Sequence, residues 1–138
     1  MWKKKIDEYV AVSGMPGIYK TSSTRNNGLL IEDMDTKKTK FISIRKHQFT
    51  PLGTVSIYTS DGDTIELKKV FQSMLDQFED NPPPAKNIPK EELMDYFEDI
   101  LPTYDKDQVY VSDVKKVIKW FNFLNERSFF TAVSDEEE

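Results

Sequence analysis

The hydrophobic period of the chain changes near residue 60, and this change limits the folds available to it. Before that point, short apolar segments alternate with turn-forming residues at intervals of roughly a dozen, which is typical of small antiparallel sheets and barrels. After it, apolar residues recur at i, i+3, i+4 and i+7, as on one face of a helix. The sequence therefore predicts an α+β protein: a small antiparallel SH3-like or Sm-like β-barrel or sheet with flanking helices, followed by a C-terminal helical hairpin.

The first half is expected to begin with a short helix and to continue as strands. Ile6, Tyr9 and Val10 fall at i, i+3 and i+4, which indicates a helix within residues 3–12. The Gly- and Pro-containing segment 13–17 should end that helix, because proline lacks an N–H and glycine permits left-handed backbone. The four strands are expected at residues 18–21, 29–32, 41–44 and 55–59.

Three helices are predicted in the second half. The first covers residues 64–78, with Asp63 and Glu66 spaced as an acidic capping box at its start. The second covers residues 90–101. The third begins with Ser112 as its N-cap and continues to about residue 124.

Domain boundaries are predicted from the proline-rich segment at residues 81–89, which cannot continue a helix. It would join a barrel-like domain of residues 1–80 to a helical hairpin of residues 90–130. Residues 131–138 would form an acidic tail.

Charge is divided unevenly along the chain. Residues 1–59 carry ten Lys and Arg against five Asp and Glu, whereas residues 60–138 carry nine against nineteen. The chain has no cysteine, which excludes disulfides and thiolate metal sites. It has neither the apolar run of a signal peptide nor a stretch of membrane-spanning length. We therefore expect a cytoplasmic protein without a membrane segment.

No arrangement of residues predicts catalysis, a metal site or a cofactor. Asp61 and Asp63 are explained by a turn, and the Asp105–Asp107 segment lacks the Gly and the closing Glu of a calcium loop. His47 has no sequence neighbour that would orient it as a base. The sequence therefore predicts a protein that is not an enzyme.

Basic residues in the predicted strands suggest one possible function. Cations that contact phosphates, together with an aromatic that stacks on bases, favour single-stranded nucleic acid on a small barrel. The low overall pI, near 5.0, favours a solvated sheet face instead. Binding of RNA or single-stranded DNA is therefore the alternative hypothesis, through Lys20, Lys37, Lys38, Lys40, Phe41 and Arg45.

Aromatic residues near the C-terminus suggest the leading hypothesis, a non-enzymatic interaction or adaptor protein. A single helix cannot place all of them on one apolar stripe. They would either pack on the preceding helix or form an exposed patch for a protein partner or a second copy, and the sequence leaves both open. The residues assigned to this docking surface are Trp120, Phe123, Phe129 and Phe130.

Three stretches carry a family resemblance: residues 13–20 (SGMPGIYK), residues 55–59 with 67–71, and residues 96–105 continuing through 110–116 (YVSDVKK) to 120–122. In this order they resemble a small bacteroidete family that is known as a domain of unknown function. The resemblance implies a cytosolic bacterial protein with a barrel-like N-terminal part and a helical C-terminal part. It implies no activity, cofactor or catalytic residue.

Overall fold

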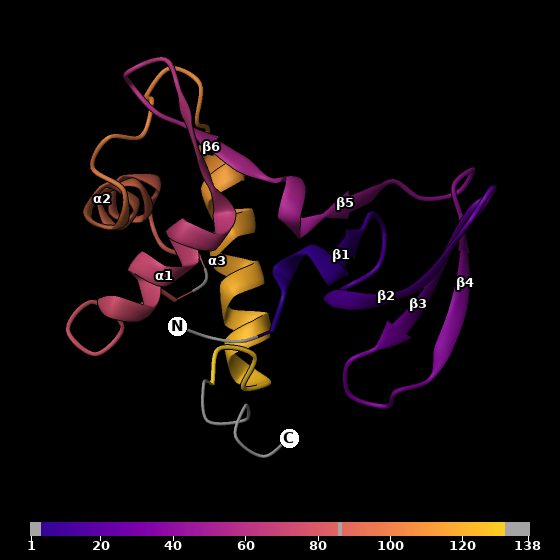
Figure 1. Ribbon diagram of the computed structural model, residues 1–138. Helices are drawn as coiled ribbons and strands as arrows, with labels where there is room; N and C mark the ends of the chain where they lie inside the picture. Colours follow the sequence, from indigo (N-terminus) through magenta and orange to yellow (C-terminus); the bar gives the residue numbers. More distant parts are fainter. Residues whose placement is uncertain (1–3, 86, 132–138) are drawn as a thin grey trace. The chain divides into compact units, whose positions relative to one another are not determined.

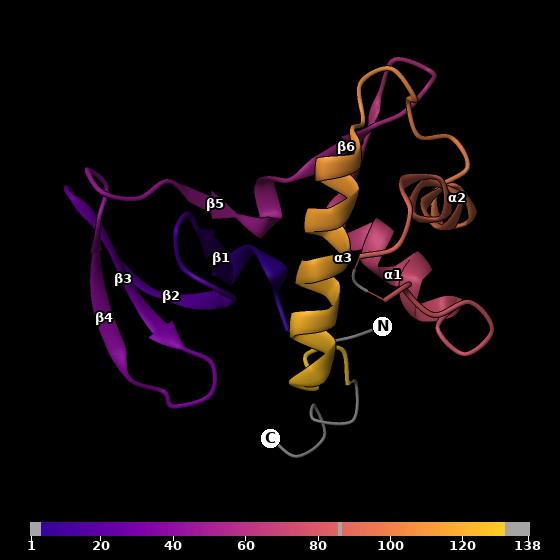
Figure 2. The same cartoon turned by 180° about the vertical axis from the view of Figure 1, so that it is seen from behind.

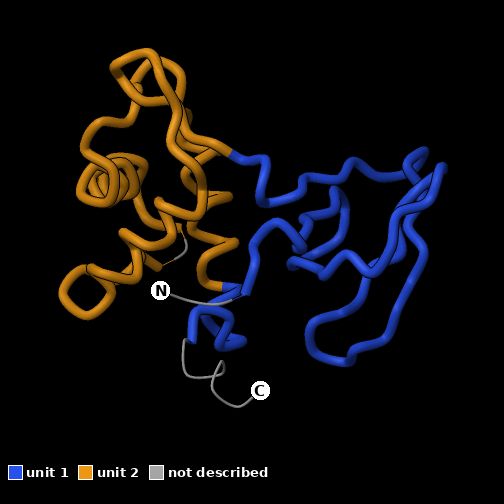
Figure 3. The backbone as a smooth tube through the Cα atoms, viewed as in Figure 1, with its two compact units in different colours: residues 1–55, 123–138 blue, residues 56–122 orange. Residues whose placement is uncertain are grey.

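The computed structural model describes residues 4–85 and 87–131, and the chain forms two compact units (Figure 3). Unit 1 comprises residues 1–55 and 123–138, and unit 2 comprises residues 56–122. Most of the expected acidic tail, residues 132–138, lies outside the described residues.

Unit 1 is built on a five-stranded antiparallel sheet with the order β4-β3-β2-β1-β5 (Figure 1). The strands are β1 (Tyr9–Val12), β2 (Ile18–Arg25), β3 (Gly28–Asp33), β4 (Thr39–Ser43) and β5 (Phe49–Pro51). Two 3₁₀ turns, η1 (Ile6–Glu8) and η2 (Leu52–Thr54), flank it. The α+β class is confirmed, and the sheet is open rather than closed into a barrel because β4 and β5 lie at its edges.

The predicted N-terminal helix is wrong: η1 is followed at once by β1, next to the β5 edge strand. Tyr9 and Val10 are adjacent and both buried, so both faces of β1 are covered. A strand covered on both faces reads as a continuous apolar run, which periodicity alone does not distinguish from a helical turn.

Each face of this sheet packs against different residues. On one face, a buried cluster joins the central strands to β4, and its members are Val10, Val12, Ile31 and Ile42. On the other face, Tyr9 is opposite Lys20 in the β1–β2 register, and its ring meets Phe129 edge-on at 4.9 Å between centroids. The segment after the last helix therefore completes the core of unit 1.

Unit 2 contains a hairpin and helical elements, seen from behind in Figure 2. The elements are β6 (Ser56–Tyr58), β7 (Thr64–Glu66), α1 (Leu67–Asp76), α2 (Lys90–Ile100) and α3 (Val111–Glu126), of which the part up to residue 122 belongs to this unit. Phe71 of α1 and Phe121 of α3 meet with ring centroids 5.9 Å apart. Both rings are fully buried, so α1 and α3 share one hydrophobic core.

The proline-rich segment is a loop inside unit 2, not the place where the units divide. The helices on either side of it contact each other directly: the Ser73 hydroxyl donates to the Ile100 carbonyl at 2.8 Å, and the Gln77 amide donates to the Asp99 carbonyl at 3.0 Å. Because α1 and α2 share a core, the rigid loop between them marks no change of domain.

The helices lie close to their predicted places, but two of the predicted caps do not form. Residues 64–66 are β7, and Glu66 makes no side-chain capping bond at the start of α1. The helix α3 begins before Ser112, and it is Asp113 that accepts a hydrogen bond from the Tyr110 N–H at 2.9 Å. Among the described residues, no helix has both the length and the apolar character needed to cross a bilayer.

Candidate interaction surfaces

The aromatic residues after α3 belong mainly to the core of unit 1. Phe129 is fully buried, Phe130 is buried beside it, and their rings meet edge-on at 5.2 Å. The expectation that these two side chains form a docking surface is corrected, because neither offers exposed area to a partner. Burial in the core of unit 1, with Phe129 against Tyr9 of β1, accounts for them. This is neither packing on the preceding helix nor an exposed patch, the two possibilities that the sequence left open.

Phe123 is covered on both sides by residues of unit 1. The Arg127 guanidinium stacks on its ring at 3.6 Å, within cation–π distance. On the other side the ring lies so close to Gly17 that a Cβ there would be 2.5 Å from Phe123 Cε2. Trp120 is half-buried and belongs to unit 2. Phe129 and Phe130 are buried, whereas Trp120 and Phe123 on α3 are half-buried, so the four aromatic residues do not form one exposed surface.

The basic residues of the predicted nucleic-acid site are exposed but are divided between the two faces of the sheet. In the β3–β4 register Lys40 is opposite Ile31, while the neighbouring Phe41 is opposite Leu30. Adjacent residues of a strand point to opposite faces, so Lys40 and Phe41 do not share a face. The other basic residues lie on β2 and in the two turns that flank β4, namely Lys20, Lys37, Lys38 and Arg45.

The strand β4 presents backbone groups at the open edge of the sheet. Asp33 N–H donates to the Lys38 carbonyl and Ile44 N–H donates to the Asn27 carbonyl, both at 2.9 Å. Hydrogen-bonded and non-hydrogen-bonded pairs alternate in an antiparallel ladder, so Lys40 and Ile42 are also turned toward β3. The backbone N–H and C=O groups of Thr39 and Phe41 consequently point away from the sheet.

Exposed apolar side chains accompany this edge. Phe41 is 43% exposed and Ile44, just beyond the strand, is 60% exposed. Basic side chains surround them, and all are exposed: Lys37, Lys38, Lys40, Arg45 and Lys46. The Asp35 carboxylate in the β3–β4 turn is paired with Arg127. We call this set, from Lys37 to Lys46 along β4 and its flanking turns, the β4 surface.

The sequence predicts several members of the β4 surface, but not Ile44, which the pattern places inside a strand. In the sequence, the alternation of the charged Lys40 with the aromatic Phe41 already indicates this surface. What the sequence does not reveal is that β4 lies at an edge, because strand order depends on long-range pairing.

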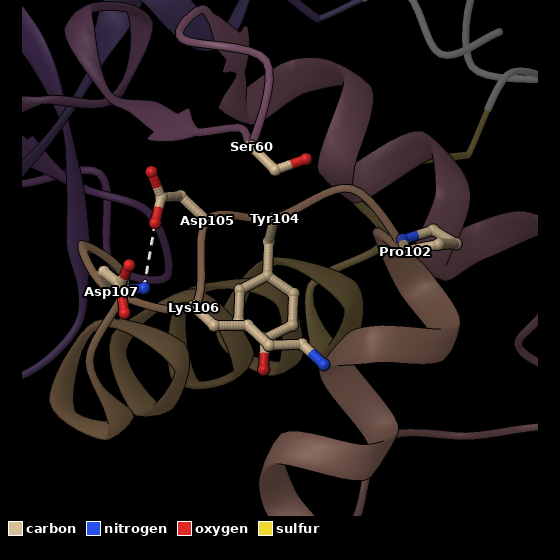
Figure 4. Close-up of a pocket in the computed structure, with 6 residues that line it drawn as sticks. All are labelled: Ser60, Pro102, Tyr104, Asp105, Lys106 and Asp107. Atoms are coloured by element: carbon tan, nitrogen blue, oxygen red, sulfur yellow. Dashed lines mark hydrogen bonds between the residues drawn. The ribbon is translucent and has the colours of Figure 1, made fainter.

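Unit 2 contains a pocket of about 370 Å³ between the end of β6 and the loop after α2 (Figure 4). One of its charged groups, the Asp105 carboxylate, accepts hydrogen bonds from the Asp107 N–H at 2.8 Å and from the Gln108 side chain at 2.9 Å. The Gln108 bond is the larger cause that holds the pKa of Asp105 below its usual value. These bonds stabilise a turn, and both oxygens of the Asp105 carboxylate take part in them.

The remaining residues considered for catalysis also have structural partners. His47 Nδ1 lies 2.7 Å from the Ser13 carbonyl oxygen, which links the turn after β4 to the end of β1. Asp61 accepts from the Thr59 hydroxyl at 2.6 Å, the first cause of its lowered pKa. Among the described residues, no three His, Asp or Glu side chains are grouped so that they could hold a metal ion.

These features define a two-unit α+β protein with an exposed basic strand at one sheet edge. The chain belongs to the family described as Domain of unknown function (DUF6852), which matches residues 55–124. A second description, Domain of unknown function (DUF5606), matches residues 6–52. The gap between the two matches falls next to the boundary of the structural units at residues 55 and 56.

A solved structure supports the bacteroidete resemblance predicted from the sequence. The solution NMR structure of a protein from Bacteroides vulgatus is 28% identical, covers 93% of each chain and has a TM-score of 0.68. None of the curated proteins matches the chain.

Proposed function

We propose that this is a non-enzymatic cytoplasmic interaction protein that binds a partner protein through the β4 surface. The observation that carries the proposal is the exposure of Phe41 and Ile44 at an unpaired sheet edge surrounded by cations. Exposed apolar groups with a charged rim are typical of protein-binding sites. A cytoplasmic location is supported by the absence of cysteine from the sequence.

Site-directed photo-cross-linking in the native host tests this proposal. A benzophenone amino acid at position 41 should capture a discrete protein partner. The same amino acid at position 110 is the matched control, because Tyr110 is more exposed than Phe41 but lies in unit 2. The adduct at position 41 should disappear when Lys38→Glu and Lys40→Glu are introduced together. Identical adducts at both positions, or none at position 41, would contradict the proposal.

Nucleic-acid binding is the second candidate, and one observation favours it. Arg25 is paired with Gly28, and a Cβ at Gly28 would be 2.8 Å from Phe41 Cζ, so the Phe41 ring lies next to Arg25 on one face. Lys20 shares that face but is opposite the carboxylate of Glu32. A cation beside an exposed ring is the pairing that single strands use.

Fluorescence anisotropy with labelled single-stranded RNA and DNA tests this candidate. Binding should weaken steeply as salt is raised, because counterions are released from each neutralised phosphate. Arg25→Glu should weaken it further, whereas Lys115→Glu in α3 should have little effect because it lies in unit 2. The absence of binding at low salt would remove nucleic acid from consideration.

A further inference from the structure

We propose that the occupant of the β4 surface is an extended peptide with alternating acidic and aliphatic residues, which adds to β4 as a further strand. This inference rests on the proposed function and specifies the partner and its mode of binding. The outward N–H and C=O groups of Thr39 and Phe41 supply the hydrogen bonds of a new ladder. Strand addition is a recurrent mode of peptide recognition, in which main-chain bonds give affinity and alternate side chains give specificity.

The alternation of charge across β4 determines the sequence pattern of the peptide. Residues directly opposite each other on paired strands share a face. A residue opposite Phe41 would lie on the face of the exposed ring, so an aliphatic side chain is favoured there. Residues opposite Lys40 and Lys38, two positions apart, would lie on the other face, where carboxylates are favoured.

The same lysines argue against a second copy of the chain as the occupant. Lysines on edge strands prevent edges from pairing with one another. Two β4 strands placed side by side would bring Lys38 and Lys40 of each copy close together, and like charges on paired strands are destabilising. An acidic strand would attract these lysines, whereas a second β4 strand would repel them. Charge complementarity therefore favours an acidic peptide over a second copy of the chain.

Amide hydrogen exchange of the full chain, measured by NMR with and without peptide, tests the binding mode. The probe is the heptapeptide Glu-Val-Glu-Val-Glu-Val-Glu, and the control has the same composition in blocks, Glu-Glu-Glu-Glu-Val-Val-Val. The alternating peptide should slow exchange of the Thr39 and Phe41 amides. The Lys40 and Ile42 amides, which already bond to β3, should change little.

Two pairs of variants separate the backbone contribution from the charge contribution. Thr39→Pro removes one outward N–H without removing a β3–β4 bond, since proline is tolerated on edge strands where its nitrogen faces solvent. It should weaken peptide binding roughly fivefold relative to Thr39→Ala, the loss expected for one hydrogen bond. Lys38→Glu with Lys40→Glu should weaken binding roughly tenfold or more. Lys115→Glu with Lys116→Glu in unit 2 is the control.

The possible outcomes are distinct for this inference and for the proposed function. Peptide binding that needs Lys38 and Lys40 but is the same for Thr39→Pro and Thr39→Ala would overturn strand addition and leave the interaction surface in place. Equal binding of the alternating and block peptides would also overturn it. Slow exchange of the Thr39 and Phe41 amides in the free chain would overturn the choice of a separate peptide. It would identify a segment of this chain as the occupant, or a second copy if the effect rises with protein concentration.

Discussion

Arg127 and Asp35 join the segment after α3 to the β3–β4 turn through a two-point ion pair. Arg127 Nε lies 3.0 Å from Asp35 Oδ1, and Nη2 lies 3.1 Å from Oδ2. The same guanidinium donates to the Phe123 carbonyl at 2.9 Å and stacks on the Phe123 ring. A planar guanidinium can satisfy all three partners at once, whereas a lysine ammonium cannot. The contact fixes the turn that precedes β4 to the core segment.

Arg127→Lys should therefore destabilise unit 1 although it retains the charge. We expect the free energy of unfolding to fall by about 1–2 kcal/mol, the sum of a half-exposed ion pair and a cation–π contact. Urea unfolding followed by circular dichroism measures the change. Lys116→Ala, an exposed position of α3, should stay within about 0.5 kcal/mol of the wild type. Equal stability of Arg127→Lys and the wild type would show that the stack and the fork contribute nothing.

Gly17→Ala should be more damaging than Gly62→Ala, although both glycines have the same left-handed backbone conformation. Gly17 has a φ of +86°, and its Cβ would lie 2.5 Å from Phe123 Cε2. Backbone strain and overpacking together should cost about 2–4 kcal/mol in urea unfolding. Gly62→Ala is the matched control, because Gly62 has a similar φ of +85° but nothing within 4 Å of its Cβ position. It should lose only the backbone part, about 1–2 kcal/mol.

A double-mutant cycle identifies the clash. If the Phe123 ring is the obstacle, Gly17→Ala should cost less in a Phe123→Ala background than in the wild type. Additive effects of the two substitutions would place the cost in the backbone alone.

Local patterns in the sequence predict elements well when one face of the element is apolar and the other polar. The helix α2 and the strand β6 are of this kind, and they form close to the expected residues. The prediction fails at β1, where Tyr9 and Val10 are both buried. It also misses β5, because a three-residue strand that contains Pro51 carries too little periodicity to be recognised.

The candidate site was predictable only in part, for a similar reason. Exposed lysines around Phe41 are visible in the sequence, but the edge position of β4 follows from pairing over long sequence distances. The aromatic residues near the C-terminus show the converse. Phe129 is a core residue because it packs on Tyr9, 120 positions earlier in the chain. A local sequence pattern cannot predict a contact over that distance.

Tyr96→Phe should leave the stability of unit 2 unchanged or raise it. The Tyr96 hydroxyl is buried in α2, and it has no hydrogen-bond partner among the residues that the structure describes. Burial raises the pKa of this phenol. Removing a buried unpaired hydroxyl should raise the free energy of unfolding by about 0–1 kcal/mol, measured by urea unfolding. A loss of more than about 1 kcal/mol would show that the hydroxyl has a partner in solution.

Acid should destabilise the turn before β4, because the ionised carboxylate of Asp33 stabilises that turn through hydrogen bonds. The Asp33 carboxylate accepts hydrogen bonds from the Thr36 N–H at 3.0 Å and the Asp35 N–H at 2.8 Å, and these bonds lower its pKa below the ordinary value of 3.8. A carboxyl whose pKa is lower in the folded state stabilises the fold fully above 3.8. That contribution is lost as the pH falls through 3.8 to the folded-state pKa.

Wild-type protein should therefore lose more stability than Asp33→Asn between about pH 5 and pH 2 in urea unfolding, because the asparagine does not titrate. An NMR titration of the Asp33 carboxyl carbon should give a midpoint below 3.8. A midpoint at or above 3.8 would contradict this account of the turn. Since Asp33 N–H and C=O also bond to Lys38 and Lys37, protonation should loosen the start of β4 before the central strands, and amide exchange at Lys38 should report it first.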